Sequence, residues 1–557
     1  MRKLTTKMMC LAMVGCMGLT AFSACDIGVE DIVEFDKNKT QLHVVTYKGG
    51  VGREWLDTIA KQFEIDYAEV PFEPNNPEKK GVEVVITPSD NSNLDLQLTG
   101  NSAVLFTENV TYRDYVLTQK FLDISDVVTN PLSNVKGSET ETATIESKMY
   151  AGQKDALTFS GGKYYAIPHY ATFATVTYNK KLFETKGYYF AKTVENPEEV
   201  SDYFISQFNL EKSCGPDGVC GTSDDGLPAT WEEFITLCDY MAGSGVDPFI
   251  WATGSMETHY LNYLLNAVYL NLAGKDQASV NFTYDSKGAT MDVVTKWDGV
   301  EPEISQVAIN ESNAGLLKQQ LAKYQALSVA EKIYTTAAYN LNNYSGTSLS
   351  LTQTSYVRSY TQARPIAFLA EGSYWYNEAK TIIDNAKKDD PSGYGEMNDY
   401  QVMPLPRYWA GSAADIQGDA STSKNTVVAD QADAYAFINA KIADDENMVN
   451  LAKTFLKYCY TDKALKSFTE TTGVPRNLQY DVDVTKLPSD YARSVWNMYK
   501  TSDVVVTASS HNLYLTNRLA SSLIIDSNFW RTQNSDLFYS ALGKGTSAKD
   551  FFKGMWN

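Results

Sequence analysis

The alternation of strands and helices near the start of the chain restricts the fold more than any other sequence feature. Residues 42–47 and 81–86 are short apolar runs that predict strands, and residues 102–106 predict a third. Between the first two, large apolar residues recur every four positions from Trp55 to Phe63, as on the buried face of a helix. Strands separated by crossovers of this length pair in parallel, with helices on both faces of the sheet. Ligands of such sheets bind beyond the carboxyl ends of the strands, so the turns after the first and third strands are candidate sites.

The motifs of common nucleotide-binding and hydrolytic proteins are missing from the sequence. The glycine-rich turn at 48–52 lacks the GxGxxG spacing, and the chain contains no GxxxxGK[ST], GxSxG or HExxH motif. Its 68 acidic residues outnumber its 48 basic residues, which gives a formal net charge of −20. So acidic a chain argues against nucleic acid as a partner and against an anionic substrate.

The first 24 residues predict a cleaved export signal. Three cations precede an apolar run at 8–22, which is too short to span a bilayer. Two small residues then lead to Cys25 in a pattern that resembles a bacterial lipobox, which implies cleavage before Cys25 and a lipid on its sulfur. Ordinary secretory cleavage, with Cys25 left free, is the alternative. We therefore expect an exported lipoprotein at the extracellular face of the cell membrane, tethered by the polar residues 25–40.

One loop carries two cysteines and three aspartates among glycines. Cys214 and Cys220 are close enough in sequence to form a disulfide, which an exported location permits. Asp217, Asp224 and Asp225 offer the carboxylate oxygens that Ca²⁺ prefers, although their spacing is not that of an EF-hand. A structural Ca²⁺ site, a plain turn and a disulfide-closed turn are the alternative interpretations. No cofactor is expected to be required.

Five segments spread over most of the chain form an ordered series. The most specific one pairs GKYYAIP at 162–168 with VTYNKKLF at 176–183. The others are PATWEEF at 228–234 with GVDPF at 245–249, AFLAEGSYW at 367–375, YQVMPLP at 400–406, and a late series of YAFIN, a helix at 451–460 and TGVPR at 472–476. In this order and with these gaps, the segments resemble the family 1 extracellular solute-binding proteins.

The resemblance implies an α/β fold of the periplasmic-binding-protein type. Such a fold has two lobes, each with a mostly parallel sheet flanked by helices, joined by a multi-crossing hinge. The matching segments predict lobe 1 at 41–167 and 407–445, lobe 2 at 168–400 and 446–557 with the C-terminal helices, and insertions in lobe 2 at about 188–228 and 271–361.

The resemblance also implies a function. It predicts the substrate-binding lipoprotein of an ABC transporter, a protein that captures a neutral carbohydrate, foremost an oligosaccharide, and carries out no reaction. The partners would then be the carbohydrate, the ABC permease and the ATPase subunits, with contact to the membrane through the lipid anchor alone. Two alternatives stay open: a binding protein for a non-sugar solute such as a peptide, polyamine or metal, and a secreted carbohydrate-active hydrolase.

Sugar sites combine flat aromatic rings with amide and charged groups that hydrogen-bond hydroxyls. The resemblance places the following side chains near the ligand: Tyr47, Lys48, Glu108, Asn109, His169, Tyr170, Trp251, His259, Tyr260, Glu371, His511, Asn512 and Tyr514. The ring that stacks on the sugar is either Tyr374 or Trp375, and a Trp packed in the core beside a surface Tyr is the alternative. Glu371 could instead cap the helix that follows it.

Overall fold

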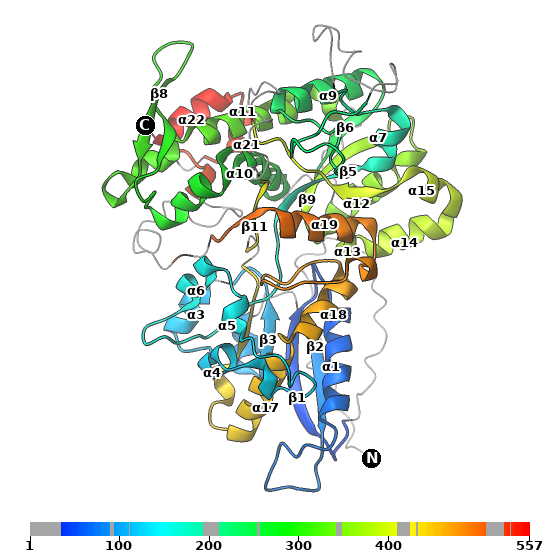
Figure 1. Cartoon of the computed structure of the whole chain (residues 1–557), viewed down its shortest axis with the longest axis vertical. Helices are drawn as coiled ribbons and strands as arrows, with labels where there is room; N and C mark the ends of the chain where they lie inside the picture. The colour runs from blue at the N-terminus through cyan, green and yellow to red at the C-terminus, as the bar shows by residue number, and fades with distance from the viewer. Residues whose placement is uncertain are drawn as a thin grey trace, which may run out of the picture.

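The chain folds into two lobes stacked along the long axis of the molecule (Figure 1). The computed structural model describes residues 35–89, 94–110, 112–192, 211–252, 257–340, 348–408, 424–430, 433–507, 509, 528–534 and 536–556. Lobe 1 is the lower half in Figure 1 and contains the N-terminal strands, whereas lobe 2 is the upper half and contains the C-terminal helices. The two-lobed α/β architecture expected from the sequence is therefore confirmed.

The sheet of lobe 1 has five strands in the order β2-β1-β3-β12-β4. Their bounds are β1 Thr40–Tyr47, β2 Val82–Ser89, β3 Val104–Thr107, β4 Ile167–Pro168 and β12 Tyr435–Ile438. Strand β1 pairs in parallel with β2 and β3, while β12 runs antiparallel to both β3 and β4. The carboxyl ends of β1 and β3 therefore lie at the same edge of the sheet, where the sequence places its first candidate turns.

Helix α1, Glu54–Asp66, covers lobe 1 with the apolar face that its spacing predicts. Trp55, Ile59 and Phe63 are buried on that face, and the Trp55 ring lies 5.0 Å from that of Phe106 on β3. The shorter helices of the lobe are α2 Leu94–Thr99, α3 Tyr112–Leu117, α4 Ser125–Thr129, α5 Ile145–Lys148 and α6 Ala151–Leu157. Helix α1 thus joins the sheet to the core of the lobe through edge-to-face contacts between aromatic rings.

The sheet of lobe 2 differs from the expected mostly parallel one. Its order is β10-β5-β9-β6, with bounds β5 Ala174–Asn179, β6 Asp247–Ile250, β9 Ile366–Gly372 and β10 Tyr400–Val402. Only β6 and β9 pair in parallel, and β5 runs antiparallel to both β9 and β10. The sheet is mixed because β5 enters lobe 2 from the hinge in the direction opposite to its neighbours.

Helices surround the sheet of lobe 2 and also build its insertions. They are α7 Lys180–Lys186, α9 Trp231–Gly243, α10 Glu257–Thr283, α11 Leu321–Thr335, α12 Leu349–Val357, α13 Trp375–Glu378, α14 Lys380–Asp389, α15 Pro391–Met397, α19 Asp490–Thr501, α21 Phe538–Leu542 and α22 Ala548–Trp556. Helix α9 begins with a capping box in which Thr230 and Glu233 bond each other's backbone, as the TWEE pattern allows.

The second predicted insertion, 271–361, contains a hairpin of its own. Strands β7 Thr290–Lys296 and β8 Glu303–Ala308 pair antiparallel and project at the upper left of Figure 1. A small separate core fills the space beneath them, formed by Val280, Tyr284, Met291, Val293, Ile309, Ala314 and Leu317. The insertion therefore adds folded structure to lobe 2.

The C-terminal course of the chain requires a correction. Residues 446–557 were all expected in lobe 2, but α17, Glu446–Tyr458, and α18, Asp462–Thr472, pack on lobe 1. The Phe468 ring of α18 lies 5.1 Å from that of Trp55, and Tyr458 donates a hydrogen bond of 2.6 Å to Asp66. The apolar faces of both helices cover lobe 1, and the chain returns to lobe 2 only before α19.

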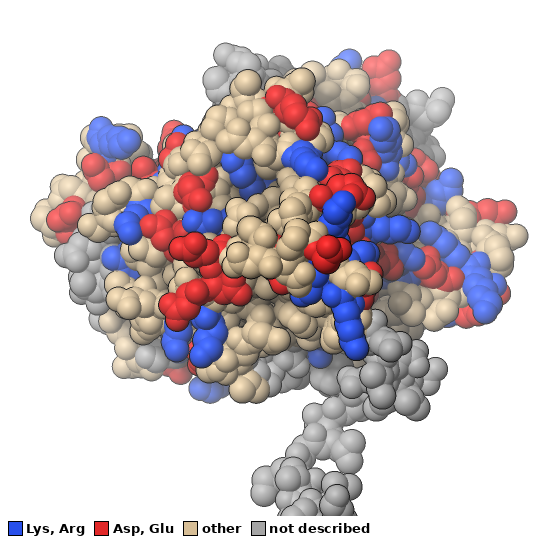
Figure 2. Space-filling view, turned by 90° about the horizontal axis from the view of Figure 1, so that it is seen from below, with Lys and Arg blue, Asp and Glu red and all other residues tan. Residues whose placement is uncertain are grey.

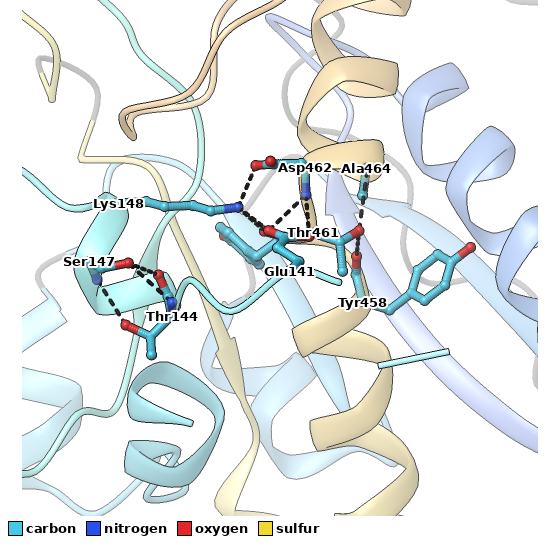
Figure 3. Close-up of polar contacts among 9 residues, drawn as sticks. Glu141, Thr144, Ser147, Lys148, Tyr458, Thr461, Asp462 and Ala464 are labelled. Atoms are coloured by element: carbon cyan, nitrogen blue, oxygen red, sulfur yellow. Dashed lines mark hydrogen bonds and ion pairs between the residues drawn. The ribbon is translucent and has the colours of Figure 1, made fainter. Parts of the chain in front are cut away.

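A buried lysine fixes the start of α18 to the rest of lobe 1 (Figure 3). Lys148 Nζ lies 2.5 Å from Glu141 Oε1 and 2.7 Å from Asp462 Oδ1. The same Glu141 carboxylate accepts the backbone N–H of Asp462. Two chain segments that are more than 300 residues apart are thereby joined within one lobe.

The strands β11, Thr426–Val428, and β13, Asp503–Val505, pair in parallel near the hinge.

Seen from the lobe 1 end, acidic and basic side chains are interspersed over the surface (Figure 2). Within the described part of the chain, the helices lack the combination of length and apolar character that a membrane crossing needs.

Candidate functional site

The two lobes contact each other between the glycine-rich turn after β1 and helix α13. Asn377 of α13 donates from its side-chain amide to the Gly50 carbonyl at 2.8 Å. Glu378, the next residue, lies close enough for the backbone N–H of Gly50 to lower the pKa of its carboxyl. Two consecutive residues of lobe 2 therefore adjoin one turn of lobe 1.

Gly50 has a conformation and surroundings that only glycine satisfies. Its φ is +57°, and a Cβ at this position would lie 2.6 Å from the Tyr170 hydroxyl and 2.9 Å from Glu108 Oε1. Tyr170 follows β4 in the hinge crossing and Glu108 follows β3, so both side chains converge on the turn. The sheet edge of lobe 1 thus presents a phenol and a carboxyl to lobe 2.

Lobe 2 contributes two further carboxyls at this contact. Glu371 lies near the end of β9, and Glu378 ends α13. The Gln353 amide nitrogen bridges them, at 2.9 Å from Glu378 Oε2 and 3.4 Å from Glu371 Oε1. Glu371 also accepts the N–H of Gly372 at 3.0 Å.

Tyrosines surround these carboxyls. Tyr260 and Tyr263 lie three residues apart on α10, with ring centroids 5.7 Å apart. The Tyr263 and Tyr374 hydroxyls are 3.2 Å apart, and the charges of Glu371 and Glu378 act on both Tyr260 and Tyr374. We call the following residues the interlobe cluster: Tyr47, Glu108, Tyr170, Tyr260, Tyr263, Glu371, Tyr374 and Glu378.

The carboxyls of the cluster hold their protons more tightly than exposed glutamates. Burial, and then the charge of Glu378, raises the pKa of both Glu108 and Glu371 well above the usual value. Burial also raises the pKa of Glu378, against the hydrogen bonds from Gln353 and Gly50. Carboxyls and phenols both form hydrogen bonds with hydroxyls, which suits a ligand rich in hydroxyls.

Comparison with solved structures shows which known proteins have a similar fold. The protein RafE in complex with raffinose aligns with a TM-score of 0.51 and 15% identity, over 93% of this chain and 99% of that one. The apo form of RafE from Streptococcus pneumoniae aligns with a TM-score of 0.50 and 14% identity, over 94% and 99%. A structure connected with xylan utilization by Caldanaerobius polysaccharolyticus aligns with a TM-score of 0.50 and 14% identity, over 93% and 99%.

The chain has the fold of the family 1 extracellular solute-binding proteins. No protein-family model and no curated protein sequence matches the chain. The chain is therefore similar to known proteins in its three-dimensional structure, and the sequence comparisons found no match.

In this solute-binding fold, six of the predicted site residues come together. They are Tyr47, Glu108, Tyr170, Tyr260, Glu371 and Tyr374. The Lys48 and Asn109 side chains are exposed beside the cluster, and Asn109 has a positive φ of 53°. Trp251 is buried after β6, with its ring 6.1 Å from that of Tyr334.

Trp375 and His169 lie in the cores of the lobes. The Trp375 ring is fully buried among the rings of Tyr356, Tyr400 and Tyr491, at 5.3 to 5.6 Å. His169 was expected at the mouth between the lobes, but it is 1% exposed and packs against Trp55. The His169 Nδ1 also contacts the buried Arg476 guanidinium, and burial followed by that charge lowers the pKa of His169 well below its usual value.

Several predicted residues lie outside the described part of the chain. They are the lipidation candidate Cys25, the side chain of His259, and the group His511, Asn512 and Tyr514. Their predicted roles stay predictions.

The aspartate loop is closed by a Cys214–Cys220 disulfide. Asp217 accepts the N–H of Val219, Asp225 accepts that of Gly221, and Asp224 accepts that of Asp217. Among the described residues, no group of three or more His, Cys, Asp or Glu side chains is arranged to hold a metal ion. The carboxylates thus serve the turn itself, and calcium binding stays a prediction.

Four residues of the contact were not identified from the sequence, namely Tyr263, Gln353, Asn377 and Glu378. Tyr263 lies one helical turn beyond the predicted Tyr260, so the helical spacing alone places both side chains on one face. Glu378 lies seven residues after Glu371, but a helix of four residues gives no periodicity that would show where it points. Gln353 belongs to the insertion, which the family motifs do not cover.

A separate hollow lies beside α13 on lobe 2. Its volume is about 310 Å³, and it is lined by Tyr376, Lys387, Tyr394, Asn398, Asp399, Tyr400, Pro488, Ser489, Asp490, Tyr491 and Arg493. The Tyr376 and Tyr491 rings stack there at 5.4 Å. This hollow contains none of the predicted site residues.

Proposed function

We propose that the protein binds a carbohydrate between its two lobes and carries out no reaction on it. The observation that carries the proposal is the interlobe cluster, in which tyrosines and carboxyls from both lobes meet around the Gly50 turn. A ligand enclosed there contacts both lobes at once, so its binding free energy favours the closed arrangement.

The chemistry of the cluster suits a sugar. Pyranose rings have apolar C–H faces, which pack on aromatic rings, and hydroxyls, which hydrogen-bond to carboxyls and phenols. Structural neighbours support the same ligand class, since RafE, with a TM-score of 0.51, was solved in complex with raffinose.

The cellular role is a further part of the proposal. The protein would deliver its sugar to the permease and ATPase subunits of an ABC importer, from a lipid anchor at Cys25 on the outside of the cell membrane. The export signal before Cys25 supports this arrangement. Replacing Cys25 by Ala should release the protein from membranes into the medium, and unchanged retention would contradict the anchor.

A single screen tests binding and the lack of turnover together. Trp375 lies next to Tyr374, so intrinsic tryptophan fluorescence should change when a panel of oligosaccharides is titrated. A bound sugar should also raise the melting temperature as mass action requires, and chromatography should recover it intact after long incubation. Detection of a cleaved sugar would show that the protein is a hydrolase and would contradict the proposal.

A further inference from the structure

Two carboxyls of lobe 2 lie together, and the described part of the chain pairs no cationic side chain with them. Glu371 is 1% exposed. The side-chain amide of Gln353 donates a hydrogen bond to Glu371 and another to Glu378. Among the described residues, no Lys, Arg or His forms an ion pair with either one, and Glu378 opposes ionisation of Glu371. A buried negative charge is unfavourable unless a cation or several hydrogen bonds compensate it.

Contact between the lobes adds a third carboxyl to this pair. Glu108 of lobe 1 is 6% exposed and lies close enough to Glu378 for their charges to repel. Bringing the lobes together therefore concentrates negative charge at the contact.

An unpartnered donor points to a ligand at the same place. Tyr170 is 1% exposed, and its hydroxyl has no hydrogen-bond partner among the residues that the structure describes. The hydroxyl lies against the Gly50 turn on the same side as Glu108 Oε1. Buried hydroxyls are nearly always paired in folded proteins, so a ligand atom is the natural partner for this one.

The tyrosine rings complete an environment that favours positive charge. Tyr260, Tyr263 and Tyr374 adjoin the carboxyls, and the electron-rich face of a phenol ring attracts an ammonium group. Carboxyls that lie beside several aromatic rings therefore favour an ammonium group.

We infer that the interlobe cluster selects a carbohydrate that carries a protonated amino group, in place of the neutral sugar that the sequence predicts. The inference rests on the proposed carbohydrate-binding function. The ammonium group would lie among Glu108, Glu371 and Glu378, and the sugar ring would lie against the tyrosines. Such a ligand supplies a positive charge that neither Glu371 nor Glu378 receives from a Lys, Arg or His of the described residues.

Calorimetric titration with two matched sugars tests the inference. The probes are the trisaccharide of glucosamine and its fully N-acetylated counterpart, which differ in the charge and the acetylation of the nitrogen. We expect the amino trisaccharide to bind at least about tenfold more tightly. Equal or tighter binding of the N-acetylated sugar would overturn the inference and leave the proposed function intact.

Charge-removing variants locate the effect. Glu378→Gln and, separately, Glu371→Gln should lower the preference for the amino sugar about tenfold, whereas Glu446→Gln, an exposed residue at the start of α17, should not. Melting temperatures verify that each variant folds. A preference unchanged in both cluster variants would overturn the placement of the amine, and failure of both sugars to bind would overturn the inference. Binding of spermidine without either sugar would instead contradict the proposed function.

Discussion

Tyr374 and Trp375 are neighbours in sequence but have different surroundings. The Tyr374 hydroxyl lies 3.2 Å from that of Tyr263 within the interlobe cluster. The Trp375 ring is enclosed by tyrosines of the lobe 2 core. Trp375 therefore packs in the core, and we propose Tyr374 as the ring that contacts the ligand.

Alanine substitution at each position should separate these roles. Tyr374→Ala should weaken sugar binding about 10- to 100-fold, because one ring contact contributes about 1–3 kcal/mol. Trp375→Ala should instead lower the free energy of unfolding by about 3–5 kcal/mol. Titration calorimetry and denaturant unfolding measure the two effects, and the reverse pattern would show that Trp375 is the stacking ring.

Asp433 makes stability depend on pH. Burial, and then the charge of Asp430, raises the pKa of the Asp433 carboxyl to about 8. The unfolded carboxyl loses its proton near pH ~4, so the folded state binds an extra proton between about pH 4 and 8. Stability from this group therefore falls as the pH rises through that window.

Asp433→Asn should remove this pH dependence. Asparagine accepts the positive φ of 44° at this position and carries no charge. The variant should be more stable than the native chain at pH 8, and the difference should shrink toward pH 4. Denaturant unfolding across this range measures it, and parallel stability curves for the two proteins would contradict the role of Asp433.

At the level of elements, the attachment of α18 to lobe 1 depends on the buried ammonium group of Lys148. The Lys148 side chain is 7% exposed, and it bonds Glu141 and Asp462 together (Figure 3). Removal of the lysine leaves the mostly buried Glu141 without its cation, which is costly in a poorly solvated position.

Lys148→Ala should lower the free energy of unfolding by about 3 kcal/mol. The matched control is Lys80→Ala, which removes an exposed pair with Glu69 in the same lobe and should cost below about 1 kcal/mol. Chemical denaturation of both variants gives the comparison. Equal effects would mean that the buried pair adds nothing beyond an ordinary surface contact.

The elements also show what the sequence can predict. Strand β1 and helix α1 were predictable because their apolar spacing is local and their buried faces follow from it. The lobe to which α17 and α18 belong was not predictable, because an amphipathic helix does not encode which surface it covers. The same holds for Glu378, whose place beside Gly50 depends on how the two lobes meet. Six predicted side chains nevertheless meet at the cluster because they follow strand ends or lie on one helix face.

At the level of the whole molecule, the two lobes share one site. Lobe 1 supplies the Gly50 turn, Glu108 and Tyr170, and lobe 2 supplies the tyrosines of α10 and the carboxyls of β9 and α13. Neither lobe has the complete set, so the binding that we propose would be coupled to lobe closure. Opening of the Asn377–Gly50 contact would admit the ligand.

A crystal structure of the protein with a bound oligosaccharide would show whether the ligand lies between the lobes. We predict a sugar between the lobes, with one ring on Tyr374 and hydrogen bonds to Glu108 of lobe 1 and Glu378 of lobe 2. A sugar bound instead in the hollow between Tyr376 and Arg493, without contact to lobe 1, would contradict it.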